Sequence, residues 1–180
     1  MKARVLILSA AALMLVGLLV LGDVDNVAVL NGYPPITVDP AVASDWYDTE
    51  TMYNLYSPLV YPAPEGGVRA HLATSWEAVG GDLTHWRFTL RQGVKFHSGY
   101  ELTAEDIAFS MTRFITMGQG NSGPLGQVTP VVVDRYTVDF LLDKPSAMLP
   151  DTLVLFFPGE GPCAGEHRPG WQLRGLRRLR

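Results

Sequence analysis

The chain has little cysteine, few cations in its central part and no arrangement typical of an enzyme active site. Its 180 residues include one cysteine, Cys163, which excludes an internal disulfide framework and a multi-thiolate metal site. Residues 23–158 contain 7 Lys and Arg against 16 Asp and Glu, a net charge of −9. An acidic surface of this kind repels phosphate backbones, so we predict no nucleic-acid partner.

Residues that bind metals or carry catalysis occur, but not in the patterns that their chemistry requires. No two of the four histidines have metal-ligand spacing on a common helix: His71, His85, His97 and His167. No serine lies in a Gly-x-Ser-x-Gly elbow. The adjacent carboxylates Glu105 and Asp106 are explained by the start of a helix. We therefore predict no enzymatic activity, no metal and no cofactor.

One glycine-rich motif, Gly118 to Gly123, matches the G-x-G-x-x-G pattern of dinucleotide sites. Such a site needs a strand before the glycines and a helix after them, so that the phosphate meets the helix N-terminus. In this sequence a predicted helix precedes the motif and Pro124 follows it. The order of elements favours a flexible loop without a nucleotide.

The first 22 residues are predicted to be a signal peptide. Lys2 and Arg4 precede an uncharged apolar run, Val5 to Leu21, and cleavage before Asp23 fits the residues around it. An uncleaved membrane anchor is the alternative, because the run approaches the length of a membrane span. No cysteine stands directly after the run to carry a lipid. Either way we expect export, to the periplasm or the outer face of the cytoplasmic membrane.

The next region mixes predicted strands and helices. Val27 to Leu30 has the composition of a short buried strand. A helix capped by Asp48 or Thr49 would carry one apolar face, formed by Met52, Leu55, Tyr56 and Leu59. The prolines and glycines of residues 62–67 predict a loop.

The middle of the chain predicts a β-hairpin, a helix and a second strand pair. Ser75 to Val79 and Thr84 to Leu90 form the hairpin, and Trp86, Phe88 and Leu90 alternate with polar residues on the second strand. A helix begins after Thr103, with Ile107, Met111 and Phe114 on its apolar face. Two further strands follow, Val128 to Val133 and Tyr136 to Leu142. The fold class is thus α/β, in the sense of a mixed α+β arrangement.

Four aromatic residues near position 50 are candidates for contact with a solute, since aromatic rings combine a large apolar face with a polar tip. Tyr53 and Tyr56 fall on the apolar helix face and are predicted to be core residues. Trp46 and Tyr47 precede the predicted helix and follow Asp45. Two adjacent rings and a carboxylate in a loop are better placed for the wall of a cleft.

Residues 159–180 differ in composition from the rest, with 5 Arg against 2 Glu and many glycines. We interpret them as a disordered or unrelated tail. The alternative is a short basic amphipathic helix over Leu173 to Arg180.

Several ordered segments resemble the signature region of family 5 extracellular solute-binding proteins, which include the oligopeptide-, dipeptide- and nickel-binding proteins of ABC importers. These segments are Leu72–Glu77, Trp86–Arg91, Gly93–Gly99 and Leu102–Ser110. Asp39-Pro40 and Leu55–Val60 also match, so the resemblance spans residues 27–157. Because the matching residues read as hairpin, turn and helix-cap chemistry, they identify the family without identifying the solute.

The resemblance implies a periplasmic-binding-protein-like fold of type II, in which two lobes close on a solute like a Venus flytrap. It implies a monomer that captures peptides outside the membrane and delivers them to an ABC-transporter permease. An oligosaccharide, a nickel chelate or an opine remains open as the solute. By analogy with the cleft-lining loop of peptide-binding members, Asp45, Trp46 and Tyr47 are expected to bind the ligand.

Family members are much longer than this chain, and the resemblance stops where the composition changes, near Phe157. We therefore interpret residues 23–158 as the N-terminal portion of the first lobe. A frameshift or a gene fragment would explain this truncated form and the change at residues 159–180, and the nucleotide sequence tests the frameshift. The competing hypothesis is a membrane-anchored or secreted interaction protein without a role in solute transport.

Overall fold

The computed structural model of the protein describes residues 33–161. The predicted signal peptide, the strand over Val27 to Leu30, and Cys163, His167 and the helix over Leu173 to Arg180 lie outside these residues. Within the described part, no helix has both the length and the apolar character needed to cross a membrane.

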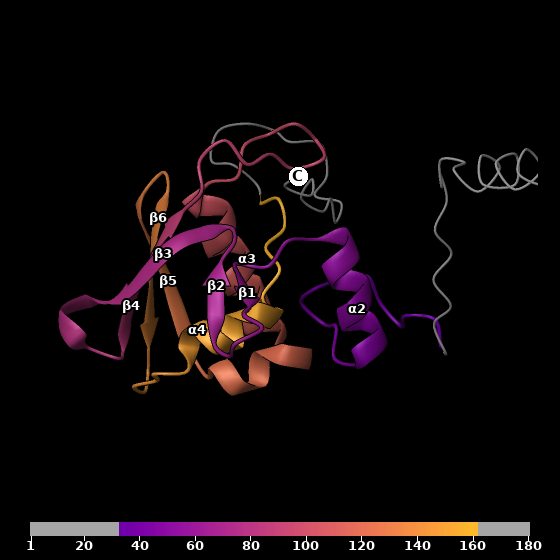
Figure 1. Cartoon of the computed structure of the whole chain (residues 1–180), viewed down its shortest axis with the longest axis horizontal. Coiled ribbons are helices and arrows are strands. Elements are labelled where there is room, and N and C mark those ends of the chain that lie inside the picture. Colours follow the sequence, from indigo (N-terminus) through magenta and orange to yellow (C-terminus); the bar gives the residue numbers. More distant parts are fainter. Residues whose placement is uncertain (1–32, 162–180) are drawn as a thin grey trace, which may run out of the picture. The chain divides into compact units, whose positions relative to one another are not determined.

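The centre of the fold is a four-stranded antiparallel sheet with the strand order β3-β4-β6-β5 (Figure 1). Its strands are β3 (Ala73–Ala78), β4 (His85–Leu90), β5 (Val128–Asp134) and β6 (Thr137–Leu142). Trp86, Phe88 and Leu90 are buried, which confirms the predicted hairpin and its inward face. β4 lies between β3 and β6 and places Phe88 opposite Val138 and Trp86 opposite Phe140. The rings of Phe88 and Phe140 meet at 5.2 Å across this pair.

Helix α3 (Ala104–Met117) packs against β5 and β6. Thr103 is its N-cap, and a capping box joins it to Asp106, whose Oδ2 accepts the Thr103 backbone N–H at 2.9 Å. Ile107, Met111 and Phe114 are buried in the same core as Phe88. Both the start of this helix and its apolar face agree with the sequence-based expectation.

The glycine-rich segment after α3 forms a short 3-10 turn, Gly120–Leu125, and not the first turn of an α-helix. Gly118 ends α3 in the left-handed conformation, at φ 59°. Strand β5 follows the turn, so the segment lacks the strand–turn–helix order that a dinucleotide site requires.

A small antiparallel pair, β1 (Val60–Pro62) and β2 (Val68–Ala70), precedes the sheet. It surrounds the proline- and glycine-rich loop that the sequence predicted. Helix α4 (Leu149–Thr152) and a 3-10 turn at Leu153–Leu155 complete the described chain.

Helix α2 (Trp46–Leu55) starts earlier than predicted. Its N-cap is Asp45, whose carboxylate accepts the Asp48 backbone N–H at 2.7 Å. The predicted cap, Asp48, instead lies in the first helical turn and is buried. Its Oδ1 accepts the backbone N–H groups of Ile36, at 2.7 Å, and Thr37, at 3.1 Å. The prediction of Asp48 or Thr49 as the cap was therefore wrong, since both residues lie inside α2 and the long-range contact of Asp48 fixes the earlier start.

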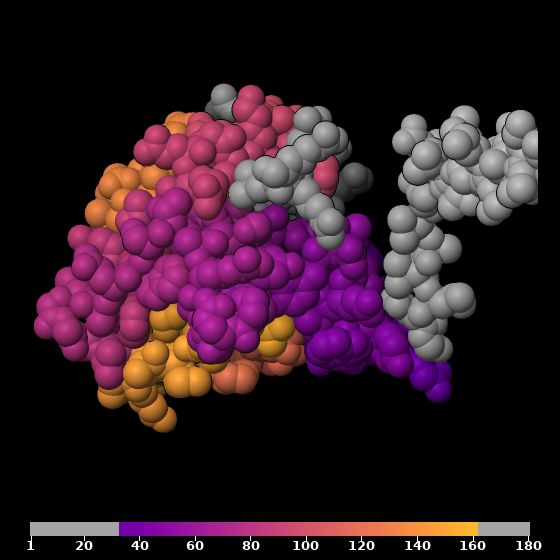
Figure 2. Space-filling view, viewed as in Figure 1, coloured from indigo at the N-terminus to yellow at the C-terminus, as the bar shows by residue number. Residues whose placement is uncertain are grey.

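The predicted apolar face of α2 is only partly correct. Met52 and Tyr56 are buried, but Leu55 is 44% exposed, and Leu59 lies beyond the helix in the main core. Met52 and Tyr56 pack with Ala43 and Phe157 in a separate small cluster. The indigo surface of the α2 region therefore adjoins the yellow-orange surface of the last described segment (Figure 2).

Candidate functional site

The three residues predicted to bind a ligand lie together at the N-terminus of α2. Asp45 is the cap, and Trp46 and Tyr47 are the first two helical residues, so the expectation of a loop position was wrong for both rings. The earlier helix start gives both residues a regular helical backbone. Trp46 is 76% exposed and makes no ring contact with another aromatic residue in the described part of the chain.

A third ring, that of Tyr33, lies beside Tyr47. It is 68% exposed, and its ring meets that of Tyr47 edge-on at 5.6 Å. The buried Asp48 carboxylate ties the backbone of Ile36 and Thr37, just after Tyr33, to the first turn of α2. We call Tyr33, Trp46 and Tyr47 the aromatic surface. Sequence reasoning missed Tyr33, because its proximity to Tyr47 depends on the contacts of Asp48.

The remaining tyrosines of this region are structural, as predicted. Tyr56 is buried and donates its hydroxyl to the Val38 carbonyl at 3.1 Å, while Tyr53 donates to the Val154 carbonyl at 2.8 Å. Burial raises the pKa of each phenol to about 12, so both stay protonated as donors. These hydrogen bonds hold α2 against its neighbours.

The segment leading to this surface is anchored on α3 by a bidentate ion pair. Arg113 Nη1 lies 2.7 Å from Asp39 Oδ1, and Nη2 lies 2.5 Å from Oδ2. Asp39 Oδ1 also accepts the Ala41 backbone N–H at 3.0 Å, which closes the Asp39-Pro40 turn. Both ionised side chains are mostly covered. Only Asp39-Pro40 was recognisable in the sequence, since the two partners are 74 residues apart.

A hollow lies beside this ion pair, between α3 and the last described segment. Its walls are mainly apolar, with Arg113, Ser110 and Glu160 as polar groups, and it is lined by Pro40, Ala41, Phe109, Ser110, Arg113, Phe114, Phe156, Phe157, Gly159 and Glu160. Ser110 Oγ accepts the Gly159 N–H at 3.0 Å, and the buried Asp106 accepts the Gly161 N–H at 3.0 Å. The first residues of the predicted tail are therefore attached to α3.

The Asp39–Arg113 pair predicts how stability depends on pH. The hydrogen bond from Arg113 holds the pKa of Asp39 below its ordinary value of 3.8, against the opposing effect of burial. Because the folded-state pKa is the lower one, the stabilisation is complete above pH 3.8 and is lost as the pH falls through the folded-state pKa. We expect Asp39→Asn to lower the free energy of unfolding by about 1–3 kcal/mol at neutral pH.

Urea unfolding at a series of pH values measures this effect. The difference between the natural chain and Asp39→Asn should shrink below pH 3.8, where Asp39 itself becomes protonated. Asp143→Asn, at an exposed carboxylate, is the control and should change little. A difference for Asp39→Asn that is constant from neutral to acid pH would contradict the assigned pairing.

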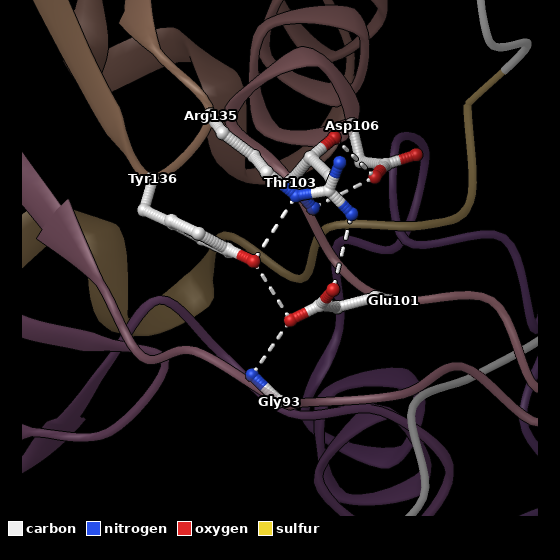
Figure 3. A network of polar contacts seen from close by, with 6 residues as sticks. All are labelled: Gly93, Glu101, Thr103, Asp106, Arg135 and Tyr136. Atoms are coloured by element: carbon white, nitrogen blue, oxygen red, sulfur yellow. Dashed lines mark hydrogen bonds and ion pairs between the residues drawn. The ribbon is translucent and has the colours of Figure 1, made fainter.

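Other polar clusters in the described chain serve the fold. Glu101 accepts hydrogen bonds from the Gly93 N–H at 2.8 Å, the Tyr136 hydroxyl at 2.9 Å and Arg135 at 3.0 Å, beside the Thr103–Asp106 capping box (Figure 3). The network joins the turn before α3 to the β5–β6 turn. Its members fall partly in the family-like segments, in agreement with the interpretation that these segments determine the fold.

The polar face of the sheet carries a second cluster that the sequence did not predict. Asp139 on β6 is buried, and it bonds both His85 Nε2, at 2.7 Å, and Arg87 Nε, at 2.7 Å, on β4. The hydrogen bond from Arg87 holds the pKa of Asp139 below its ordinary range. In residues 33–161, no group of three or more His, Cys, Asp or Glu side chains is arranged to hold a metal ion.

The sequence profile of the bacterial extracellular solute-binding proteins, family 5 (middle region), matches residues 67–165. The probable D,D-dipeptide-binding periplasmic protein DdpA of Escherichia coli K12 is 33% identical over 136 residues, covering 72% of this chain and 26% of DdpA. A region of the HTH-type transcriptional regulator SgrR of Escherichia coli O6:K15:H31 is 32% identical over 105 residues, covering 57% of this chain and 18% of SgrR.

Solved structures of periplasmic binding proteins share the fold. The unliganded open form of MppA, a periplasmic murein tripeptide-binding protein, superimposes with a TM-score of 0.62 at 25% identity, covering 71% of this chain and 28% of MppA. The mixed α/β class and the relation to type II periplasmic binding proteins are thereby confirmed. The chain spans about a quarter of the length of DdpA and of MppA.

Proposed function

Because the chain belongs to family 5 of the bacterial extracellular solute-binding proteins, we propose that it captures peptides or similar small solutes outside the cytoplasmic membrane and delivers them to an ABC-transporter permease. Family 5 proteins bind solutes and are not enzymes, and DdpA and MppA are named for the peptides they bind. We extend this role to the chain as a binding protein without a catalytic step. Export rests on the apolar run Val5 to Leu21.

The aromatic surface at the N-terminus of α2 is the observation that carries the proposal. An exposed tryptophan and a tyrosine at the helix start, together with Tyr33 from the preceding segment, provide flat apolar area. The first backbone N–H groups of α2 carry partial positive charge, which favours peptide carbonyl oxygens and carboxylates. Asp45 adds a carboxylate that suits a peptide ammonium group. Together these groups match the two polar ends and the apolar side chains of a short peptide.

In this proposal the described chain forms one wall of the binding cleft. Closure of a two-lobed binding protein requires ligand contacts to both lobes. The hollow beside Arg113 lies between α3, the Pro40-Ala41 turn and the last described segment. We propose that it belongs to the same wall. A related region also occurs in SgrR, a transcriptional regulator. Membership of the family therefore supports solute binding more strongly than it supports import. Delivery to a permease is the part of the proposal that peptide binding alone does not test.

We expect Trp46→Ala to weaken the binding of a tri- to pentapeptide pool at least tenfold, because exposed tryptophans at the centre of a contact contribute about 2 kcal/mol or more to affinity. Isothermal titration of the purified chain measures the affinity, and fluorescence of Trp46, identified with Trp46→Phe, reports its contact with the ligand. The free energy of unfolding should change by less than about 0.5 kcal/mol, since the side chain is exposed.

Leu55→Ala is the matched control, because Leu55 is an exposed apolar residue at the other end of α2. It should leave peptide affinity within twofold of the natural value, a difference of about 0.4 kcal/mol. If Trp46→Ala and the natural chain bind peptides with equal affinity, the aromatic surface is not part of the binding site. A folded chain that gives no saturable heat with peptides would contradict the proposed function itself.

A further inference from the structure

Cationic and aromatic side chains lie together at the β1–β2 pair. Arg69 on β2 lies opposite Tyr61 on β1 in the strand register. The Arg69 guanidinium carbon is 5.1 Å from the centroid of the Tyr61 ring, and the His71 ring meets the same tyrosine edge-on at 5.2 Å. Arg91 directly follows β4, and its side chain reaches the backbone of His71. We call Arg69, His71 and Arg91 the basic cluster.

Hydrogen bonds fix the basic cluster at the junction between β2 and the sheet. Arg91 donates its Nε–H to the His71 carbonyl at 3.0 Å, and its backbone N–H to the Leu72 carbonyl at 2.7 Å. The Arg69 guanidinium is held over the Tyr61 ring by cation–π attraction. Both guanidinium groups are therefore pre-positioned, and the outward N–H groups of each remain for another acceptor.

Arg69 and Arg91 differ from the other arginines of residues 33–161 in lacking a neutralising carboxylate, a lack that they share with the exposed Lys95 and Lys144. Residues 33–161 contain 7 Lys and Arg against 15 Asp and Glu. Arg87, Arg113 and Arg135 each pair with a carboxylate. Within the described chain, neither Arg69 nor Arg91 has a carboxylate at ion-pair distance. In an acidic chain, two arginines that both reach the Tyr61–His71 pair and have no carboxylate partner among the described residues mark a place where an anion would be stabilised.

The pKa of His71 indicates that the charges of Arg69 and Arg91 both act on its imidazole ring. The pKa of His71 is lowered, first by burial and then by the nearby charges of Arg91 and Arg69. His71 is therefore neutral at neutral pH, and its ring is available as a hydrogen-bond donor or acceptor. Guanidinium groups bind phosphate and carboxylate oxygens in a bidentate manner, and an adjacent neutral imidazole suits the same oxygens.

We propose that Arg69 and Arg91, together with His71, form a binding site for one oxyanion group, a phosphate or a carboxylate, carried by a soluble ligand or by a lipid headgroup. This site is separate from the aromatic surface and does not depend on the proposed peptide-binding function. The Tyr61 ring supports the site, because it contacts Arg69 and His71 and also lies 5.4 Å from the ring of Tyr53 on α2.

Titration of the full chain with inorganic phosphate tests the site, with the His71 ring protons followed by NMR at constant ionic strength. Phosphate should shift these signals saturably, and bound phosphate should raise the pKa of His71, because a nearby anion stabilises the imidazolium. The double variant Arg69→Gln/Arg91→Gln should weaken phosphate binding at least tenfold, a factor that corresponds to about 1.4 kcal/mol. Without phosphate, its His71 pKa should already be higher, since two neighbouring cations are gone.

Lys95→Gln/Lys144→Gln is the matched control, because it removes the same net charge from exposed positions elsewhere. It should keep phosphate affinity within twofold. A parallel arm uses phosphatidylglycerol vesicles, with phosphatidylcholine vesicles for comparison. Binding of free phosphate assigns a soluble ligand, and binding of anionic vesicles alone assigns a lipid headgroup. Equal losses in both double variants, or no saturable response to either probe, would overturn the proposal.

Discussion

Phe88→Ala is expected to lower the free energy of unfolding by about 3–5 kcal/mol, the largest effect we predict for a single substitution. Phe88 is fully buried on the central strand β4. It contacts Phe140 of β6 at 5.2 Å and Trp76 of β3 at 6.3 Å, between ring centroids. Removing the ring deletes contacts to both neighbouring strands and leaves a cavity that rigid strands cannot close.

Urea unfolding followed by far-ultraviolet circular dichroism measures this loss without relying on the nearby tryptophans. Thr89→Ala is the control, since Thr89 is the next residue on the same strand and is exposed on the opposite face. It should cost no more than about 1 kcal/mol, the range of strand propensities. If the two variants unfold at similar urea concentrations, the face assignment of β4, on which the core depends, is wrong.

Prediction from the sequence succeeded where a local pattern and the final packing agree. The alternation on β4 and the Thr103 capping box are short-range signals, and the structure places both as expected. The β1–β2 pair was missed because each strand has only three residues, too few to show a period. Pro62 within β1 also reads as a breaker, and it is tolerated because each strand of an isolated pair is an edge strand.

The candidate site was less predictable, because tertiary contacts assemble it. The sequence placed Asp45, Trp46 and Tyr47 in a loop, whereas the bonds from Asp48 to Ile36 and Thr37 move the helix start forward to Trp46. The ion pair of Asp39 with Arg113 joins residues that are 74 positions apart, and nothing near either residue signals the other. Such pairings become visible only once the packing of α3 is known.

The glycine-rich motif shows how one pattern serves a different purpose from the one it suggests. Its middle glycine, Gly120, has a positive φ of 57°. A Cβ atom at this position would lie 2.2 Å from the Ala43 carbonyl oxygen and 3.1 Å from that of Val42. Asn121 donates its side-chain N–H to the same Ala43 oxygen at 3.3 Å. The turn therefore supports the segment that ends, two residues later, at Asp45.

Gly120→Ala is accordingly expected to destabilise the fold by about 2–4 kcal/mol, because the left-handed conformation and the backbone clash each cost about 1–2 kcal/mol. Gly123→Ala in the same turn is a close control. Its Cβ would meet nothing within 4 Å, and its φ lies outside the left-handed region, so the change should be neutral or stabilising by up to about 1 kcal/mol.

The two alanine variants also separate support of the site from general stability. Any relief of the clash must move either the turn or the backbone of Ala43, and Ala43 leads directly into the α2 cap. Binding is measured without urea, at a temperature where both variants remain folded. We expect Gly120→Ala to weaken peptide binding at least fivefold, about 1 kcal/mol, and Gly123→Ala to leave it unchanged. Equal stability and equal affinity in the two variants would show that the turn and the Ala43 segment do not touch, and the α2 N-terminus would then need another source of rigidity.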